Sequence, residues 1–256
     1  YLPSLDKAVW EKSDRIAGVP VDDQSALKGP QQLAIKRSRL SVEILKRQSN
    51  DATKYDLFQR LNAGGTAANA QEIRNCIVIM VNRAYSNFMR ELSRSDSFLT
   101  VLDATEDQIE KQRHMEYISR FLVHTYVPYN GKLDVEEFID DGIVTLATVN
   151  ETQQAGATFS ATFELLNEVF GKNALRRFQN GVPGGRVGHA AFEGIAVGIA
   201  KNIQHIQRKA NPVDYVRQRI EGFWQAPDVQ SFFVAGLTGT TRIQRTVPFG
   251  AEWFAS

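Results

Sequence analysis

The sequence predicts a mainly α-helical protein, a multi-helix bundle with one small β element near the N-terminus. After about residue 51, apolar residues recur three and four positions apart, as on one face of a helix. Before that point, only residues 40–45 alternate apolar and polar side chains as a strand does. Helix-start signals precede several of the periodic segments, in which an Asn, Thr or Asp is followed three residues later by Glu or Gln: Asn69 with Glu72, Thr105 with Gln108, and Asp134 with Glu137.

The N-terminal elements come first in this interpretation. Residues 1–30 are expected to be irregular because Gly and Pro interrupt them. The strand at 40–45 has no partner later in the chain, and the chain starts at Tyr1 without Met, so we expect a β-rich part upstream. A helix is then expected across Leu57 and Leu61. Another is expected from Asn69 past Phe88, with an apolar stripe that faces the core and includes Ile73, Ile77, Met80 and Val81.

The remaining helices follow in order. One long helix is expected from Thr105 through Leu122, one after Asp134, and one that Gly171 ends. A helix rich in small residues carries Phe192, and Pro212 opens the next helix. The last segment, 228–254, is expected to be helical with interruptions at Gly236, Gly239 and Pro248. The weakest joint, residues 127–131, divides the prediction into two domains, 1–127 and 128–256. The alternative is that it is a loop within one bundle.

Composition limits the function. The chain has 30 Lys and Arg against 29 Asp and Glu, which argues against binding nucleic acid through bulk charge but allows a local basic groove. The single cysteine, Cys76, excludes an intramolecular disulfide and a Cys-based zinc site, and is expected to be a small buried apolar residue. No apolar run is long enough for a membrane span and no signal peptide opens the chain, so we expect a cytoplasmic protein without a membrane partner.

The most informative stretch is residues 57–76, here called the glycine-turn motif. Gly64 and Gly65 allow left-handed backbone angles and a close approach to a ligand. A helix N-terminus with an arginine nearby favours an anion such as phosphate. The alternative is an ordinary turn between two helices, with capping alone explaining the polar residues. The candidate nucleotide- or phosphate-binding residues are Arg60, Asn62, Gly64, Gly65, Thr66, Gln71, Glu72 and Arg74.

The motif closely resembles the signature F-x-R-[IL]-N-x-G-G-T-x-L-x-x-Q-E-I-R-N of the GmrSD-type restriction family, catalogued as domain of unknown function two-six-two, to which SspE-like defence proteins belong. The resemblance covers residues 1 to about 90 well. It implies a helical portion that packs under a ParB- or sulfiredoxin-like α/β part linked to binding and hydrolysis of nucleoside triphosphates, with the β element as its remnant. A looser resemblance, to a C-terminal G-x-G-T…R…W-F segment, involves Gly236, Gly239, Thr240, Arg242, Arg245, Trp253 and Phe254.

The chain departs from the family pattern in two respects. The family motif D-G-Q-Q-R is absent, and its nearest likeness, residues 22–25, lacks the glycine and the arginine. Nucleoside triphosphate with Mg²⁺ is therefore expected only if the upstream α/β part is present, and whether the chain is an enzyme stays open. The four histidines, expected at surface or half-buried positions, lack the spacing of a nuclease or metal site, so we expect no catalytic residue and no metal: His114, His124, His189 and His205.

Four other stretches of the sequence each allow more than one interpretation or lack a site motif. Thr240, Arg242 and Arg245 form a second anion-site candidate that fits a nucleic-acid phosphate, or else a capped helix with a solvated basic face. The acidic residues at 134–141 suit magnesium or a helix N-terminus. The Gly-rich stretch 180–186 is expected to be a flexible loop. The basic residues around 36–47 fit a nucleic-acid groove or a charged strand edge.

These observations lead to two hypotheses. In the first, the chain is a nucleotide- or DNA-associated helical module of prokaryotic anti-phage defence, in which Arg60 and Arg74 neutralise phosphate, Asn62 and Gln71 orient it, and Glu72 caps the helix. In the second, the chain is a non-catalytic scaffold that docks a partner protein or a second copy. Burial of the two arginines separates the hypotheses: an open pocket favours a ligand, whereas helix caps and ion pairs favour the scaffold.

Overall fold

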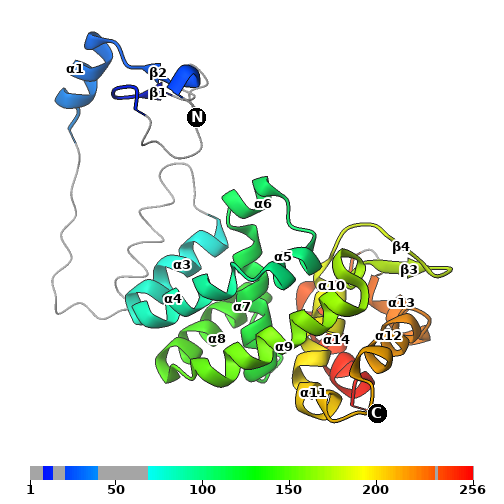
Figure 1. Cartoon of the computed structure of the whole chain (residues 1–256). Helices are drawn as coiled ribbons and strands as arrows, with labels where there is room; N and C mark the ends of the chain where they lie inside the picture. Colours follow the sequence, from blue (N-terminus) through cyan, green and yellow to red (C-terminus); the bar gives the residue numbers. More distant parts are fainter. Residues whose placement is uncertain (1–7, 14–20, 40–68, 234–235, 256) are drawn as a thin grey trace. The chain divides into compact units, whose positions relative to one another are not determined.

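The computed structural model describes residues 8–13, 21–39, 69–233 and 236–255 (Figure 1). It confirms a mainly helical protein, with short strands as the only β structure in these described residues. The chain divides into two compact units, residues 1–49 and 50–256. The strand expected at 40–45 and the helix expected across Leu57 and Leu61 lie outside the described residues.

The first unit contains the small β element. Strands β1 (Ala8–Val9) and β2 (Ser25–Ala26) pair in parallel, with Ala8 opposite Ser25, and helices η2 (Val21–Asp23) and α1 (Gly29–Arg37) flank β2. Buried Gln24 fixes this region, because its Nε2 donates to the Ser13 carbonyl at 2.7 Å and its Oε1 accepts from the Ser13 N–H at 2.8 Å. Residues 1–30, expected to be irregular, thus contain strands where they are described.

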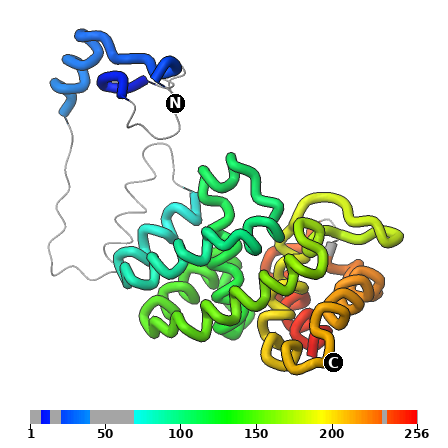
Figure 2. Tube along the Cα trace, in the orientation of Figure 1, coloured from blue at the N-terminus to red at the C-terminus, as the bar shows by residue number. Residues whose placement is uncertain are grey.

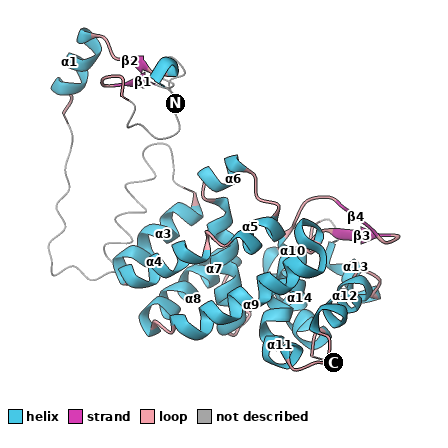
Figure 3. Cartoon of the chain, viewed as in Figure 1, coloured by secondary structure: helices cyan, strands magenta, loops and turns pink. Residues whose placement is uncertain are grey.

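The second unit is a bundle of helices, shown by secondary structure in Figure 3 and as a trace in Figure 2. Two segments of 3-10 helix, η3 (Gly171–Asn173) and η5 (Ser231–Phe233), and one π-helical segment, η4 (Phe192–Ala196), interrupt or extend them. The α-helices are α3 (Ala70–Val81), α4 (Arg83–Leu92), α5 (Asp96–Leu102), α6 (Glu106–Glu110), α7 (Arg113–Tyr126), α8 (Val135–Val149), α9 (Thr152–Phe170), α10 (His189–Ala191), α11 (Val197–Gln207), α12 (Pro212–Phe223), α13 (Pro227–Gln230) and α14 (Gly239–Trp253).

Two helices expected to be long are each divided. The first stops at Asn82, whose side chain accepts from the Tyr85 N–H and starts α4, while its amide donates to the Ala147 carbonyl. An Asn side chain competes with the helical backbone for hydrogen bonds, which favours a new helix start at this position. The second breaks at Gln112, whose φ of 54° lies in the left-handed region. The predicted helix starts at Asn69, Thr105 and Asp134 are confirmed.

The Gly-rich stretch 180–186 begins as a hairpin and not as a flexible loop. Strands β3 (Arg177–Gln179) and β4 (Val182–Gly184) are antiparallel, with Phe178 opposite Pro183. Asn180 and Gly181 connect them with φ of 51° and 79°, the pair of positive angles that a tight two-residue hairpin turn requires. In the C-terminal segment, Pro248 lies inside α14 and does not end it.

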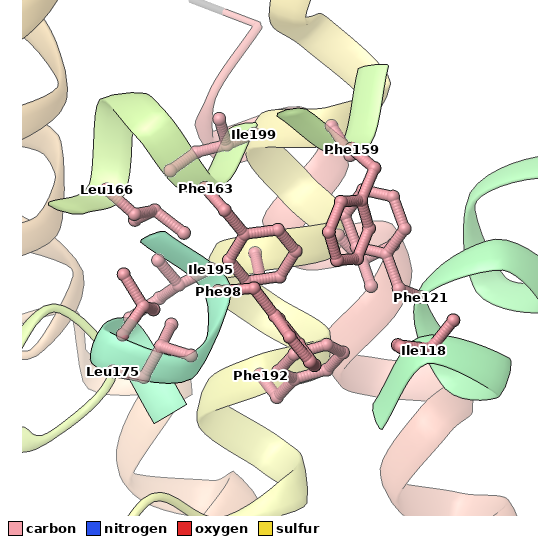
Figure 4. Packing of buried hydrophobic residues seen from close by; sticks show 14 of the residues in the cluster. Phe98, Ile118, Phe121, Phe159, Phe163, Leu166, Leu175, Phe192, Ile195 and Ile199 are labelled. Carbon is pink, nitrogen blue, oxygen red and sulfur yellow. The ribbon is translucent and has the colours of Figure 1, made fainter. Parts of the chain in front are cut away.

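Five phenylalanines form the centre of the core (Figure 4). Phe159 and Phe163 from α9 lie 4.6 Å apart between ring centroids, and Phe98 from α5 meets Phe163 edge-on at 4.9 Å. Phe121 from α7 and Phe192 from η4 complete the group. The same cluster of buried residues thus contains side chains from both sides of residue 127.

The α14 helix crosses η4 and α11 very closely. Gly194 and Gly198 face Gly250, and this contact has no room for side chains. A Cβ placed on Gly198 would lie 2.6 Å from the Gly250 carbonyl oxygen, and one on Gly250 would overlap the carbonyl oxygen of Gly194. The crossing therefore depends on the absence of side chains at Gly198 and Gly250, whereas a Cβ on Gly194 would meet the ring of Phe223 in α12.

Gly250→Ala is expected to lower the free energy of unfolding by about 3 kcal/mol, because the added methyl group forces the two helices apart. The matched control is Gly184→Ala in β4, where a Cβ meets nothing within 4 Å, and its effect is expected to stay within about 0.5 kcal/mol. Denaturant unfolding of both variants measures the difference. Equal stability of the two variants would show that the crossing is looser than the structure has it.

Candidate functional site

The described part of the glycine-turn motif is helix α3. Its start is capped in both directions, because the Asn69 N–H donates to Glu72 Oε2 at 2.8 Å and the Glu72 N–H donates to Asn69 Oδ1 at 3.0 Å. Gln71 and Arg74 share one face of the helix, as expected, but that face is buried: Gln71 is 6% exposed and Arg74 is 0% exposed. Met80, expected in the core, is 40% exposed instead. The motif residues Arg60, Asn62, Gly64, Gly65 and Thr66 lie outside the described residues.

Each of the three guanidinium nitrogens of Arg74 donates a hydrogen bond to a neighbouring side chain. Its Nε donates to Asp140 Oδ1 at 2.7 Å, and its Nη2 donates to Glu136 Oε2 at 2.9 Å. Its Nη1 donates to Gln71 Oε1 at 2.7 Å. Both carboxylates come from α8, so these bonds join the motif helix to α8.

The two carboxylates respond differently to this environment. Burial raises the pKa of Asp140, and the ion pair with Arg74 only partly opposes it. Burial also acts to raise the pKa of Glu136, but the guanidinium groups of Arg120 and Arg74 outweigh it and lower that pKa. Glu136 therefore stays ionised between two arginines.

Arg120 continues the contacts from α8 into α7. It is 2% exposed, and its Nη2 donates to Glu136 Oε1 at 2.6 Å. Its Nε donates to Glu116 Oε1 at 2.9 Å, one helical turn earlier. Its Nη1 lies 3.9 Å from Glu193 Oε1. Arg120 therefore stands between carboxylates of three separate elements.

Glu193 is completely buried in the π-helical turn η4. Arg242 of α14 binds it with two parallel hydrogen bonds, from Nε to Oε2 at 2.9 Å and from Nη2 to Oε1 at 3.0 Å. The Thr246 hydroxyl donates to Oε2 at 3.0 Å. A π-helical turn is rare and often marks a constrained position, and here it carries the most deeply buried carboxylate described.

These residues form one ion network, which joins α3, α7, α8, η4 and α14. It is called the buried ion network here because Arg74, Arg120 and Glu193 are buried, whereas Glu116, Glu136 and Asp140 are partly exposed. It consists of Arg74, Glu116, Arg120, Glu136, Asp140, Glu193 and Arg242. The arginines of the network face carboxylates of the same chain, so the network holds helices together and offers no open phosphate site. It also connects the motif helix to the second anion-site candidate, two segments that the sequence singled out separately.

The second anion-site candidate does not converge on one point. Arg242 is directed at Glu193, whereas Arg245 is exposed. Thr238 is the residue that caps α14, accepting from the Thr241 N–H, and Thr240 only shares a hydroxyl contact with Thr238 at 3.1 Å. The face expected to be solvated instead contributes one arginine to the buried ion network.

The acidic residues at 134–141 are accounted for without a metal. Asp134 caps α8 by accepting from the Glu137 N–H, and Glu136 and Asp140 bind arginines. Among the described residues, no group of His, Cys, Asp and Glu has the geometry to hold a metal ion.

Sequence reasoning missed Arg120 and Glu193. The spacing of Glu116 and Arg120, one turn apart on a helix, was an available signal for a pair. A single Glu within the small, apolar stretch around Ile195 was a signal for a buried carboxylate that needs a cation.

Two of the histidines are more deeply buried than expected. His114 is 7% exposed and His124 is 2% exposed, whereas a surface or half-buried position was expected. Burial lowers the pKa of His124 to about 3, and Arg120 adds to the effect. His124 lines a cavity of about 320 Å³ beside Tyr129 and Lys201. Because of this low pKa, His124 is neutral at physiological pH.

Comparison of the chain with protein-family models, with curated proteins and with solved structures found no match. The resemblance to the GmrSD-type family therefore rests on the glycine-turn motif and stays a prediction. Within the residues that the structure describes, none of the helices combines the length and the apolar character that crossing a membrane requires.

Arg74→Met is expected to lower the free energy of unfolding by about 3 kcal/mol, because it leaves Asp140 and Glu136 without their shared cation. Exposed Arg83→Met on α4 is the matched control, with an expected change below about 0.5 kcal/mol. Adding Asp140→Asn to Arg74→Met should recover part of the loss, and a double-mutant cycle measures this coupling. Strictly additive effects would contradict the pairing.

Acid is expected to destabilise the protein through His124. An unfolded histidine has a pKa near 6.5, and the folded value is about 3, so the unfolded state binds the proton first as the pH falls. The stabilising contribution is present above pH 6.5 and decreases toward pH 3, by about 1.4 kcal/mol per pH unit. Urea unfolding at several pH values between 7 and 4 gives the dependence of the free energy of unfolding on pH. This dependence should be shallower for His124→Gln than for the parent, whereas exposed His205→Gln should keep the dependence of the parent. Parallel slopes for all three proteins would refute the assignment.

Proposed function

We propose that the chain is the helical module of a nucleotide- or DNA-associated protein of prokaryotic anti-phage defence, of the GmrSD-type restriction family that its motif resembles. The proposal is supported by the resemblance of the glycine-turn motif and by the reciprocal cap of Asn69 and Glu72 that starts its described helix, α3. Within it, the bonds of buried Arg74 to Asp140 and Glu136 give that arginine a positioning role. A ligand-binding turn needs a rigid base to hold its geometry. In this proposal, the bonds of Arg74 supply that base through α3, the described helix of the motif.

This proposal divides the motif into two roles. Arg60, Asn62 and the backbone of residues 64–66 contact phosphate, because arginine and backbone N–H groups suit that anion. Gln71, Glu72 and Arg74 position the helix and do not touch the ligand. Hydrolysis of a nucleoside triphosphate with Mg²⁺ belongs to the proposal only where an upstream α/β part completes the site.

A second candidate function is a scaffold that docks a partner protein or a second copy of the chain. Ile79 and Met80 favour it, since 44% and 40% of their surfaces are exposed on α3. The burial of Arg74 in ion pairs favours it as well. This scaffold needs no ligand.

The test is binding of labelled ATP, GTP and duplex DNA to the full chain and to Arg60→Ala and Asn62→Ala. The parent is expected to bind at least one of them, and each substitution to weaken that binding about ten-fold, the usual loss for a charge-assisted contact. Arg94→Ala, an exposed arginine outside the motif, is the matched control and should bind like the parent. Arg74→Ala is unsuitable as a binding probe because it also breaks the buried ion network.

The outcomes separate the two candidates. Binding that Arg60→Ala and Asn62→Ala both weaken supports the phosphate-binding role of the motif. Absence of binding by the parent, together with a dimer in light scattering that Met80→Glu dissociates, supports the scaffold and overturns the first proposal.

A further inference from the structure

A second polar cavity lies apart from the glycine-turn motif. It measures about 490 Å³ and is formed by three segments: the end of α5 with α6, the first turns of α7, and residues between Arg176 and His189. All of its lining residues are in the described part of the chain. The proposed function does not use it.

We propose that this cavity binds a small ligand through an oxyanion group, a phosphate or a carboxylate, held between Arg113 and Arg186. Both arginines line the cavity and are exposed. In the described residues neither guanidinium forms an ion pair or a side-chain hydrogen bond. Guanidinium groups match the planar oxygens of such an anion with two parallel hydrogen bonds.

The carboxylates of the cavity are already paired. Asp103 pairs with Arg176, and Asp107 pairs with Lys111. Glu116 accepts from Arg120 at 2.9 Å and lies 3.4 Å from His189 Nε2. Each carboxylate of the cavity therefore has a cationic partner besides Arg113 and Arg186, and Arg113 adds an electrostatic attraction to Asp107.

His114 points independently to a ligand. His114 is only 7% exposed and lines the cavity. Its Nδ1 has no hydrogen-bond partner in the described structure. An unpaired buried polar atom is costly, and a bound group is one way to satisfy it. Burial lowers the pKa of His114, and a hydrogen bond with the Gln108 backbone opposes this effect, so the ring is neutral.

The start of helix α7 also favours an anion in this cavity. The helix begins after Gln112 without a capping side chain, and Arg113 and His114 are its first two residues. The N–H groups at a helix start carry partial positive charge and favour an anion.

Contacts within the protein already hold the walls of the cavity in place without a ligand. Arg176 Nη1 donates to the Gly185 carbonyl at 2.9 Å and holds the end of the hairpin. The ring of Tyr117 packs edge-on against Phe192 at 4.9 Å, and its hydroxyl donates to the Val187 carbonyl at 3.4 Å. A site with walls already in place loses little free energy in ordering them on binding.

The experiment is isothermal titration of the full chain with pyrophosphate and, separately, with citrate. The parent is expected to bind one or both, and Arg113→Gln and Arg186→Gln each to weaken that binding about ten-fold or more. Arg94→Gln is the matched control, since it removes an exposed arginine elsewhere and should bind like the parent. Thermal unfolding checks that both exposed-site variants keep the parent fold.

Each outcome of the titration supports or overturns the proposal. Binding of pyrophosphate alone supports a phosphate ligand, and binding of citrate alone supports a carboxylate ligand. No binding of either up to millimolar concentration, or equal binding by the parent and both variants, overturns the proposal. Binding that Arg60→Ala weakens while Arg113→Gln and Arg186→Gln leave it at the level of the parent belongs to the glycine-turn motif and overturns the proposal for this cavity.

Discussion

The rest of the second unit depends on the burial of Arg120 among carboxylates. An arginine keeps its charge in a protein interior, so it cannot adapt to burial by losing a proton. It therefore requires acidic partners at close range, and those partners come from its own helix, from α8 and from η4. Removing one partner leaves a buried charge uncompensated, which costs more than the pair contributes. The bundle is in this way limited to one arrangement of helices, around which the aromatic core packs.

Local chemistry explains which parts of the fold the sequence could predict. The helix starts at Asn69, Thr105 and Asp134 were predictable because a cap and its partner lie three residues apart. The break at Asn82 was not, because it depends on a hydrogen bond to Ala147, a residue far along the chain. The hairpin at Asn180 was readable from its Asn-Gly pair, but the surrounding glycines favoured a flexible loop.

The difference between local and long-range contacts also explains how much of the candidate site the sequence could predict. The sequence singled out Arg74 as a candidate for binding phosphate, but it could not tell a phosphate from a carboxylate as its partner. Asp140 lies 66 positions away, and Glu193 lies 49 positions from Arg242. Only the folded chain brings these charges together. The phosphate-binding role of Arg60 and its neighbours stays a prediction.

The π-helical turn that carries Glu193 makes the length of its helix a constraint in its own right. A π turn accommodates one residue more than an α turn. Removing a single residue from this turn would return it to α geometry, which changes how the residues of the turn itself are presented while the helix on either side keeps its face. Glu193 would then face away from Arg242, and Gly194 away from Gly250, even though no residue type at the contact had changed. The length of this turn is therefore as much a part of the Glu193 site as the identity of the residues in it.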